Sequence, residues 1–134
     1  MPGPAATWRI EDDLVEVLAG AAPLARRRCF ARGETIYAQG EVSPSFFLLL
    51  EGLAVVSIVR EDGSEIVLEF MGPHTVCGEG AAFDGLPRFS GATALEETVA
   101  LEFDARRYRE IVERNPGFAV ALMRVTSVKQ RILA

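Results

Sequence analysis

Glycine turns that recur through the middle of the chain constrain its fold more than any other feature. They separate short runs rich in Val, Ile, Phe and Leu, which include ETIYAQ, SFFLLLE, LAVVSIVR, SEIVLEFM and ETVALEF. Short strands at spacings of about 8 to 12 residues, with turn signals between them, are typical of a β-sandwich or barrel. The clearest hairpin signal is Asp62-Gly63, because this pair supplies the positive φ that a tight turn needs. The sequence therefore predicts a mainly β domain.

Helical patterns flank this β region on both sides. Residues 11–19 read EDDLVEVLA, with acids first and apolar residues after them, which predicts a short N-terminal helix. After Phe103, the pattern predicts a helix over 105–114 capped by Asp104, and Asn115-Pro116 separates it from a last helix that runs to residue 134. We therefore expect two C-terminal helices within 104–134.

The last helix carries apolar residues at alternating spacings of three and four, which is the pattern of a coiled-coil seam. The seam residues are Phe118, Ala121, Val125, Val128 and Ile132. A helix packed on its own barrel gives a similar pattern, so both interpretations stand. Of the two, we favour self-association of the chain as a homodimer through this helix.

Length and charge narrow the class of protein. A chain of 134 residues fits one domain, and we expect residues 1–134 to form a single unit. The net charge of −5 argues against binding of nucleic acid or an anionic membrane by this chain. The run Arg26-Arg27-Arg28 is interpreted as a solvated strand edge. Without a membrane-length apolar stretch or a secretory leader, a cytoplasmic location is expected.

The stretch 78–94 reads GEGAAFDGLPRFSGATA and holds one acid, Glu79, and one base, Arg88, among small residues. Gly78 and Gly80 allow close approach of the backbone to a bound group. A short helical turn over 81–83 and the planar Arg88 fork suit a phosphate, whereas a carboxylate accepts hydrogen bonds from hydroxyls. Together these groups fit a nucleotide. The alternative is a Glu79–Arg88 ion pair on a surface loop, and the chemistry alone leaves both open.

The same stretch resembles the phosphate-binding cassette of the cyclic-nucleotide-binding domain family, which includes the effector domains of catabolite-activator-type (Crp/Fnr) transcription regulators. ARGETIYAQGE resembles the opening strands of that family, FFLLLEGLAVVSIVREDGSEIVLEFMGP its central strands, and NPGFAVAL the start of its long C-terminal helix. The resemblance covers roughly residues 30–131. It implies a double-stranded β-helix, or jelly-roll, barrel.

The resemblance also implies roles for the residues of the cassette. Glu79 is expected to bind the ribose 2′-hydroxyl, and Arg88 is expected to pair with the cyclic phosphate. The full set of expected ligand-binding residues is Gly78, Glu79, Gly80, Ala81, Arg88, Phe89 and Ser90.

The chain departs from the family pattern at several positions. Gly80 and Ala82 replace leucines, Phe89 adds bulk after the arginine, and Gly91 stands where the pattern has threonine. The polar residues that cap the purine late in the C-terminal helix are matched by apolar Leu133-Ala134. Recognition of phosphate and ribose is therefore expected to be kept, while base selectivity is left open.

Catalytic and metal-site interpretations find little support in the sequence. His74 and Cys77 are two possible ligands, but we interpret them as a loop histidine and a structural cysteine, and no metal site is expected. Two cysteines, Cys29 and Cys77, do not make a disulfide scaffold. No nucleophile elbow or Walker loop is present, so an enzyme is not expected.

We therefore expect a ligand-sensing domain that binds a cyclic nucleotide, with cAMP favoured over cGMP, and that relays binding through its C-terminal helix. The cyclic nucleotide is an effector, and no cofactor is expected. No DNA-binding segment follows Ala134 in this sequence, so the chain is interpreted as the regulatory part of a transcription regulator or as a stand-alone sensor. The alternative keeps the fold with a different effector, or with no ligand as a dimerisation scaffold.

Overall fold

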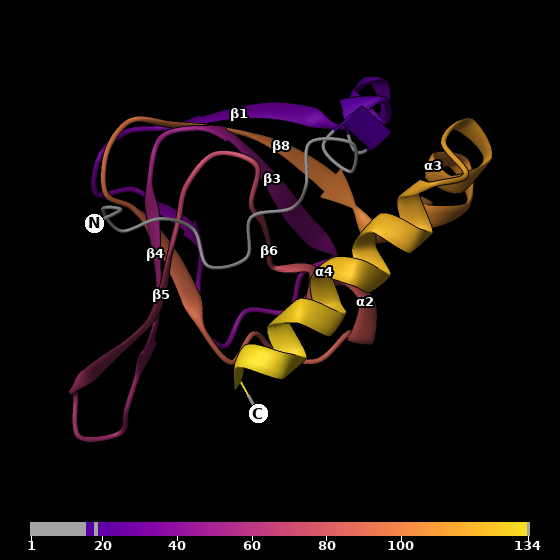
Figure 1. The fold of residues 1–134 in the computed structure, drawn as a ribbon. Coiled ribbons are helices and arrows are strands. Elements are labelled where there is room, and N and C mark those ends of the chain that lie inside the picture. Colours follow the sequence, from indigo (N-terminus) through magenta and orange to yellow (C-terminus); the bar gives the residue numbers. More distant parts are fainter. Residues whose placement is uncertain (1–15, 18, 134) are drawn as a thin grey trace.

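The computed structural model describes residues 16–17 and 19–133 of the chain (Figure 1). Most of the helix expected over 11–19 lies outside the described residues, but Glu16, Val17 and Ala19 are helical. No helix in the part of the chain that the structure describes is long and apolar enough to cross a membrane.

Eight strands form two antiparallel four-stranded sheets. The strands are β1 (Arg26–Phe30), β2 (Thr35–Tyr37), β3 (Ser45–Glu51), β4 (Ala54–Val59), β5 (Glu65–Met71), β6 (Val76–Cys77), β7 (Gly91–Ala94) and β8 (Thr98–Asp104). One sheet has the order β1-β8-β3-β6, and the other has the order β2-β7-β4-β5. The mainly β class is confirmed, while the jelly-roll path of the chain stays a prediction.

Strand β3 is buried on both faces, which explains why its sequence is a continuous apolar run rather than an alternating one. Successive side chains of a strand point to opposite faces of the sheet. Phe47 and Leu49 therefore lie in the cluster between the two sheets, whereas Phe46 and Leu48 belong to a second cluster that contacts the helices.

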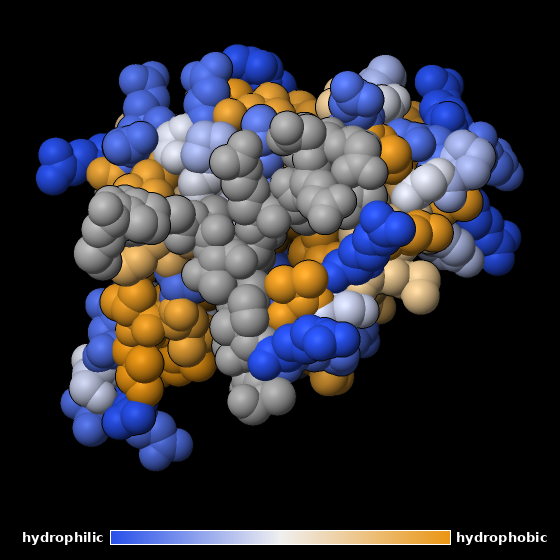
Figure 2. Space-filling model, viewed as in Figure 1, coloured by the Kyte–Doolittle hydropathy of each residue, from blue (hydrophilic) through white to orange (hydrophobic). Residues whose placement is uncertain are grey.

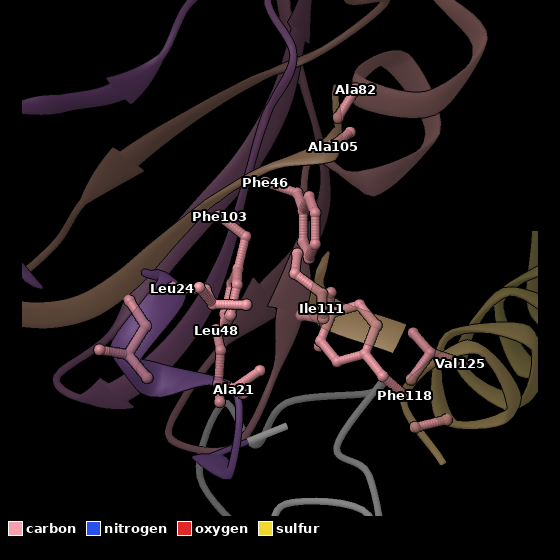
Figure 3. Packing of buried hydrophobic residues seen from close by; sticks show 13 residues of the cluster. Ala21, Leu24, Phe46, Leu48, Ala82, Phe103, Ala105, Ile111, Phe118 and Val125 are labelled. Atoms are coloured by element: carbon pink, nitrogen blue, oxygen red, sulfur yellow. The ribbon is translucent and has the colours of Figure 1, made fainter. Parts of the chain in front are cut away.

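The second cluster holds the helices against the outer face of the β1-β8-β3-β6 sheet. Figure 3 shows Phe46 and Phe103 of the sheet facing Phe118 and Val125 of the last helix. The rings of Phe46 and Phe118 lie 6.1 Å apart between centroids, and those of Phe103 and Phe118 lie 5.7 Å apart. This packing fixes where the last helix lies relative to the sheet.

The helices are η1 (Ala22–Leu24), α2 (Glu79–Asp84), η2 (Ala105–Arg107), α3 (Tyr108–Arg114) and α4 (Phe118–Leu133). The two C-terminal helices α3 and α4 are confirmed, as is the cap, because the Asp104 side chain accepts a hydrogen bond from the Arg106 N–H. In α3, Ile111 is buried, whereas Tyr108 is 48% exposed.

The predicted seam of α4 does not form one continuous exposed stripe. Its first three residues, Phe118, Ala121 and Val125, are buried in the helix–sheet cluster of this chain, whereas Val128 is 45% exposed. The interpretation of α4 as a helix packed on its own domain therefore holds for this half of the seam.

Two further local predictions concern the hairpin turn and the arginine run. The Asp62-Gly63 turn joins β4 and β5 as predicted, with Gly63 at φ 86°. Strand β1 lies at a sheet edge, where Arg26 and Arg27 are exposed, but Arg28 is half-buried and its Nη1 donates to Glu102 at 2.8 Å. Figure 2 shows exposed hydrophobic side chains over the β4–β5 side of the molecule, where Val59, Val67 and Phe70 are the large apolar residues with accessible surface.

Candidate functional site

The candidate site is built around helix α2 and the loop that follows it. Gly78 precedes α2 with φ 78°, in the left-handed region that favours glycine. A Cβ at Gly78 would lie 2.9 Å from Nη1 of Arg88, so only glycine permits the guanidinium to come this close.

Helix α2 is anchored by Ala82, which is buried in the helix–sheet cluster, and by Phe83, whose ring lies 5.4 Å from that of Phe46. Apolar anchors are therefore kept despite the missing leucines.

Arg88 is buried, with 3% of its surface exposed, and its guanidinium is held by carbonyl oxygens. Nη1 donates to the Gly78 carbonyl at 3.1 Å and Nη2 donates to the Ser45 carbonyl at 2.6 Å. Nε donates to Glu41 at 3.3 Å, and the guanidinium carbon lies 4.5 Å from the ring centroid of Tyr37.

These contacts fix the orientation of Arg88 without using all of its hydrogen-bonding capacity. A guanidinium has five N–H donors, and the contacts above use three of them. The partners are two neutral carbonyls and one carboxylate, Glu41, whose side chain is 43% exposed. Within the part of the chain that the structure describes, two N–H donors of Arg88 are therefore left for an anion.

Glu79, the first residue of α2, is buried with 7% of its surface exposed, and it is paired with helix α4. The Lys129 ammonium donates to both carboxylate oxygens of Glu79 at 2.8 Å and to the Val76 carbonyl at 2.9 Å. The alternative of a Glu79–Arg88 surface ion pair is wrong. Both side chains are buried, and each has a different charged partner.

Lys129 was not identified by the sequence reasoning, although two signals point to it. It is the only lysine of the sequence, in a chain with many arginines. It also follows the buried Val125 by four residues, so both side chains lie on the same face of the helix. That face packs against the sheet, which brings the Lys129 ammonium to the site.

The predicted residues converge on one pocket of about 180 Å³. All seven of them line it: Gly78, Glu79, Gly80, Ala81, Arg88, Phe89 and Ser90. Six further residues that were not predicted complete the lining: Tyr37, Val56, Leu68, Glu69, Cys77 and Lys129. The pocket thus combines two cationic groups, two carboxyl groups and an apolar wall, and the roles of the individual residues stay predictions.

Gly91, one of the departures from the family pattern, lies where a side chain has little room. It is the first residue of β7, and a Cβ there would lie 3.2 Å from the backbone nitrogen of Gln39 and 3.4 Å from the Tyr37 carbonyl oxygen. A larger residue would therefore require the backbone of residues 37–39 to move by a few tenths of an ångström.

Burial changes the pKa of titratable side chains that line the pocket. Burial raises the pKa of the Cys77 thiol to about 12, so the thiol stays protonated at neutral pH. A metal ligand must be a thiolate, which this environment disfavours. Within residues 16–17 and 19–133, no group of three or more His, Cys, Asp and Glu side chains is arranged to hold a metal ion. These observations give no support to a metal site at His74 and Cys77.

Comparison with known proteins gives the family. A family model of the cyclic nucleotide-binding domain matches residues 27–115, and the chain belongs to this family. The CRP-like cAMP-activated global transcriptional regulator of Mycobacterium tuberculosis is 32% identical over 102 residues, which are 76% of this chain and 46% of that regulator. The Cyclic AMP receptor protein of Thermus thermophilus is 28% identical over 91 residues, 68% of this chain and 42% of the receptor. The chain spans about half the length of these relatives.

Solved structures share the fold. The Thermus thermophilus Catabolite Activator Protein superposes with a TM-score of 0.79 at 24% identity, and the match covers 92% of this chain and 57% of that chain. Oxidized CprK in complex with o-chlorophenolacetic acid superposes with a TM-score of 0.78 at 25% identity, over 94% of this chain and 50% of the other.

Proposed function

We propose that this chain is the effector-sensing domain of a transcription regulator and that it binds a cyclic nucleotide, with cAMP preferred over cGMP. The observation that carries this proposal is the convergence of a buried Arg88 and a buried Glu79 on one pocket with a small-residue wall. Residues 1–134 are proposed to act as one cytoplasmic sensing domain that recognises its ligand and does not transform it.

The donor and acceptor types assign a role to each part of the pocket. The free N–H groups of Arg88 suit the cyclic phosphate, since a guanidinium binds phosphate oxygens with paired, charge-assisted hydrogen bonds. Glu79 accepts a hydrogen bond from the ribose 2′-hydroxyl. The remaining predicted residues, Gly78, Gly80, Ala81, Phe89 and Ser90, border the ligand.

Similarity supports the same ligand class. The relatives in Mycobacterium tuberculosis and Thermus thermophilus carry cAMP in their names, and the family model is that of a cyclic nucleotide-binding domain. Because the matches cover less than half of those proteins, the DNA-linked activity of the whole regulator is part of the proposal.

Relay of the signal is proposed to run through Lys129. This residue joins α4 to Glu79, so a ligand hydroxyl that hydrogen-bonds Glu79 competes with the ammonium for the same carboxylate oxygens. The ligand then favours the arrangement of α4 in which this competition is smallest. A ligand can shift an equilibrium only through such a difference in interaction between two states.

A homodimer through α4 is proposed to use the exposed face of that helix rather than the buried half of the seam. Val120, Met123 and Val128 are exposed there by 51%, 68% and 45%. We expect light scattering to give twice the mass of the chain, and Met123→Glu to shift the population to the monomer, because a buried charge opposes association. A monomeric parent chain would contradict this part of the proposal.

Calorimetric titration of the ligand-free chain with cAMP and with cGMP tests the proposed function, and 5′-AMP serves as the control. We expect saturable heat from the cyclic nucleotides and weaker binding of 5′-AMP, because its phosphate brings a second negative charge into a pocket that also holds the Glu69 and Glu79 carboxyl groups, and an unpaired buried charge is costly. Absence of heat and of thermal stabilisation with both cyclic nucleotides would overturn the proposal.

An aromatic carboxylate is the second candidate ligand. The observation that favours it is the pairing of Glu79 with Lys129, which leaves a pocket with a cation at Arg88 and apolar walls at Val56 and Leu68. CprK, which shares the fold, is described in complex with o-chlorophenolacetic acid. The same titration with this acid distinguishes the two candidates.

A further inference from the structure

Glu69 lies in the pocket because of a β-bulge. Val56 of β4 pairs with Glu69 of β5, but the next residue, Ser57, pairs with Val67, so Leu68 is an extra residue on β5. Strict alternation would put Glu69 on the same face as the exposed Val67. The bulge changes this, since a bulge re-aims the side chains around it, and both Leu68 and Glu69 line the pocket.

The carboxyl of Glu69 has hydrogen-bonding capacity that the protein does not use. Its Oε2 is buried, and no partner is found for it in the part of the chain that the structure describes. A buried polar atom without a partner is costly, and a functional role is one explanation for its persistence. The Glu69 side chain lines the same pocket as Arg88 and Glu79, which already have proposed ligand partners.

Of the three parts of a nucleotide, the nucleobase is the one that we expect near Glu69. The step rests on the proposed function, in which Arg88 holds the phosphate and Glu79 holds the ribose. The lining residues outside the cassette include the apolar side chains of Val56 and Leu68, and Glu69 lines the pocket next to Leu68 in the sequence. Apolar side chains suit the faces of a flat ring, and one polar group suits its edge.

We propose that Glu69 is a specificity-determining residue whose carboxyl hydrogen-bonds the edge of the nucleobase and discriminates adenine from guanine. A neutral carboxyl has one O–H donor and one carbonyl acceptor, which match the ring nitrogen and the amino group of adenine. An ionised carboxylate has acceptors only, and these match the N1–H and N2–H₂ donors of guanine. The proton on Glu69 thus decides which base is preferred.

The surroundings of Glu69 bring the pKa of its carboxyl close to neutral pH. Burial raises the pKa of the Glu69 carboxyl to about 7, the Lys129 ammonium on α4 lowers it, and the Glu79 carboxylate on α2 raises it. The other titratable groups that line the pocket are Tyr37 on β2, Cys77 on β6 and Arg88. Because adenine requires the neutral form, cAMP binding is linked to proton uptake above this pKa.

The test is the affinity of cAMP and of cGMP for the parent chain and for Glu69→Gln, measured at about pH 6 and about pH 8. With a pKa of about 7, the neutral fraction of Glu69 falls about tenfold over this range and the ionised fraction rises about tenfold. The affinity for cAMP relative to that for cGMP should therefore fall about 100-fold. Glu69→Gln keeps one donor and one acceptor at both pH values, and its preference for cAMP should not change with pH. Glu65→Gln, at an exposed carboxylate of the same strand, is the matched control and should behave as the parent.

Two results would overturn this proposal while the proposed function stands. One is a ratio of affinities that does not depend on pH in the parent chain, and the other is a pH dependence that Glu69→Gln leaves unchanged. Absence of binding of either nucleotide at both pH values would overturn the proposed function together with this inference. Circular dichroism of each variant checks that the fold is retained.

Discussion

Replacing Arg88 by alanine is expected to weaken cAMP binding by about 100-fold, since charged hydrogen bonds contribute about 1.5–3 kcal/mol each. The guanidinium is already oriented by the carbonyls of Gly78 and Ser45, so a phosphate meets donors that need no rearrangement. Loss of the side chain removes both the positive charge and this preorganised geometry. Calorimetric titration measures the change in Kd.

Because Arg88 also satisfies two carbonyl oxygens, its removal affects the fold as well as the ligand. We therefore pair Arg88→Ala with Arg88→Gln, whose neutral amide retains N–H donors for those carbonyls. Both variants should lose binding if the positive charge is what the phosphate recognises. Arg60→Ala, at an exposed arginine of the β4–β5 hairpin, is the matched control and should bind as the parent does. Full binding by a folded Arg88→Gln would contradict the assigned role.

Lys129→Met is expected to lower the free energy of unfolding by about 3 kcal/mol, because removing one partner leaves the other charge buried and unpaired. The side chains of Lys129 and Glu79 are only 16% and 10% exposed, so the carboxylate left behind is poorly solvated. The Val76 carbonyl loses its donor in the same variant. Denaturant unfolding of parent and variant measures the difference.

The double variant Glu79→Gln/Lys129→Met separates the ion pair from the packing of α4. With the buried charge also removed, most of the lost stability should return, since a neutral pair avoids the unpaired carboxylate. Arg131→Met changes an exposed cation two residues further along the same helix and should have little effect. Equal losses in Lys129→Met and Arg131→Met would contradict a buried ion pair between α4 and α2.

Features that depend on neighbouring residues in the sequence could be predicted. The apolar run 45–51 and the Asp62-Gly63 turn indicated strands and a hairpin because an apolar run bounded by turn residues, and the turn itself, can be identified from a few neighbouring residues. All seven predicted pocket residues lie within residues 78–90, so a single sequence motif was enough to identify them. Glycine at 78 was expected to permit close approach, and the guanidinium of Arg88 is the group that comes close.

Features that depend on how distant elements meet could not be predicted. Glu69 reaches the pocket only because Leu68 is an extra residue in β5, and a one-residue change of register reverses which side chains face inward. Lys129 reaches Glu79 only because Phe118, Ala121 and Val125 pack α4 onto the sheet. The same packing explains why the predicted seam residues do not form a continuous exposed stripe on α4. The carboxylate of Glu79 therefore has a partner 50 residues away in the chain.

A crystal structure of the chain with cAMP tests the central claim most directly. The account predicts the cyclic phosphate within hydrogen-bond distance of the Arg88 guanidinium and the ribose 2′-hydroxyl on the Glu79 carboxylate, with the base between Val56, Leu68 and Glu69. An empty pocket at saturating cAMP, or a nucleotide bound away from Arg88 and Glu79, would contradict it.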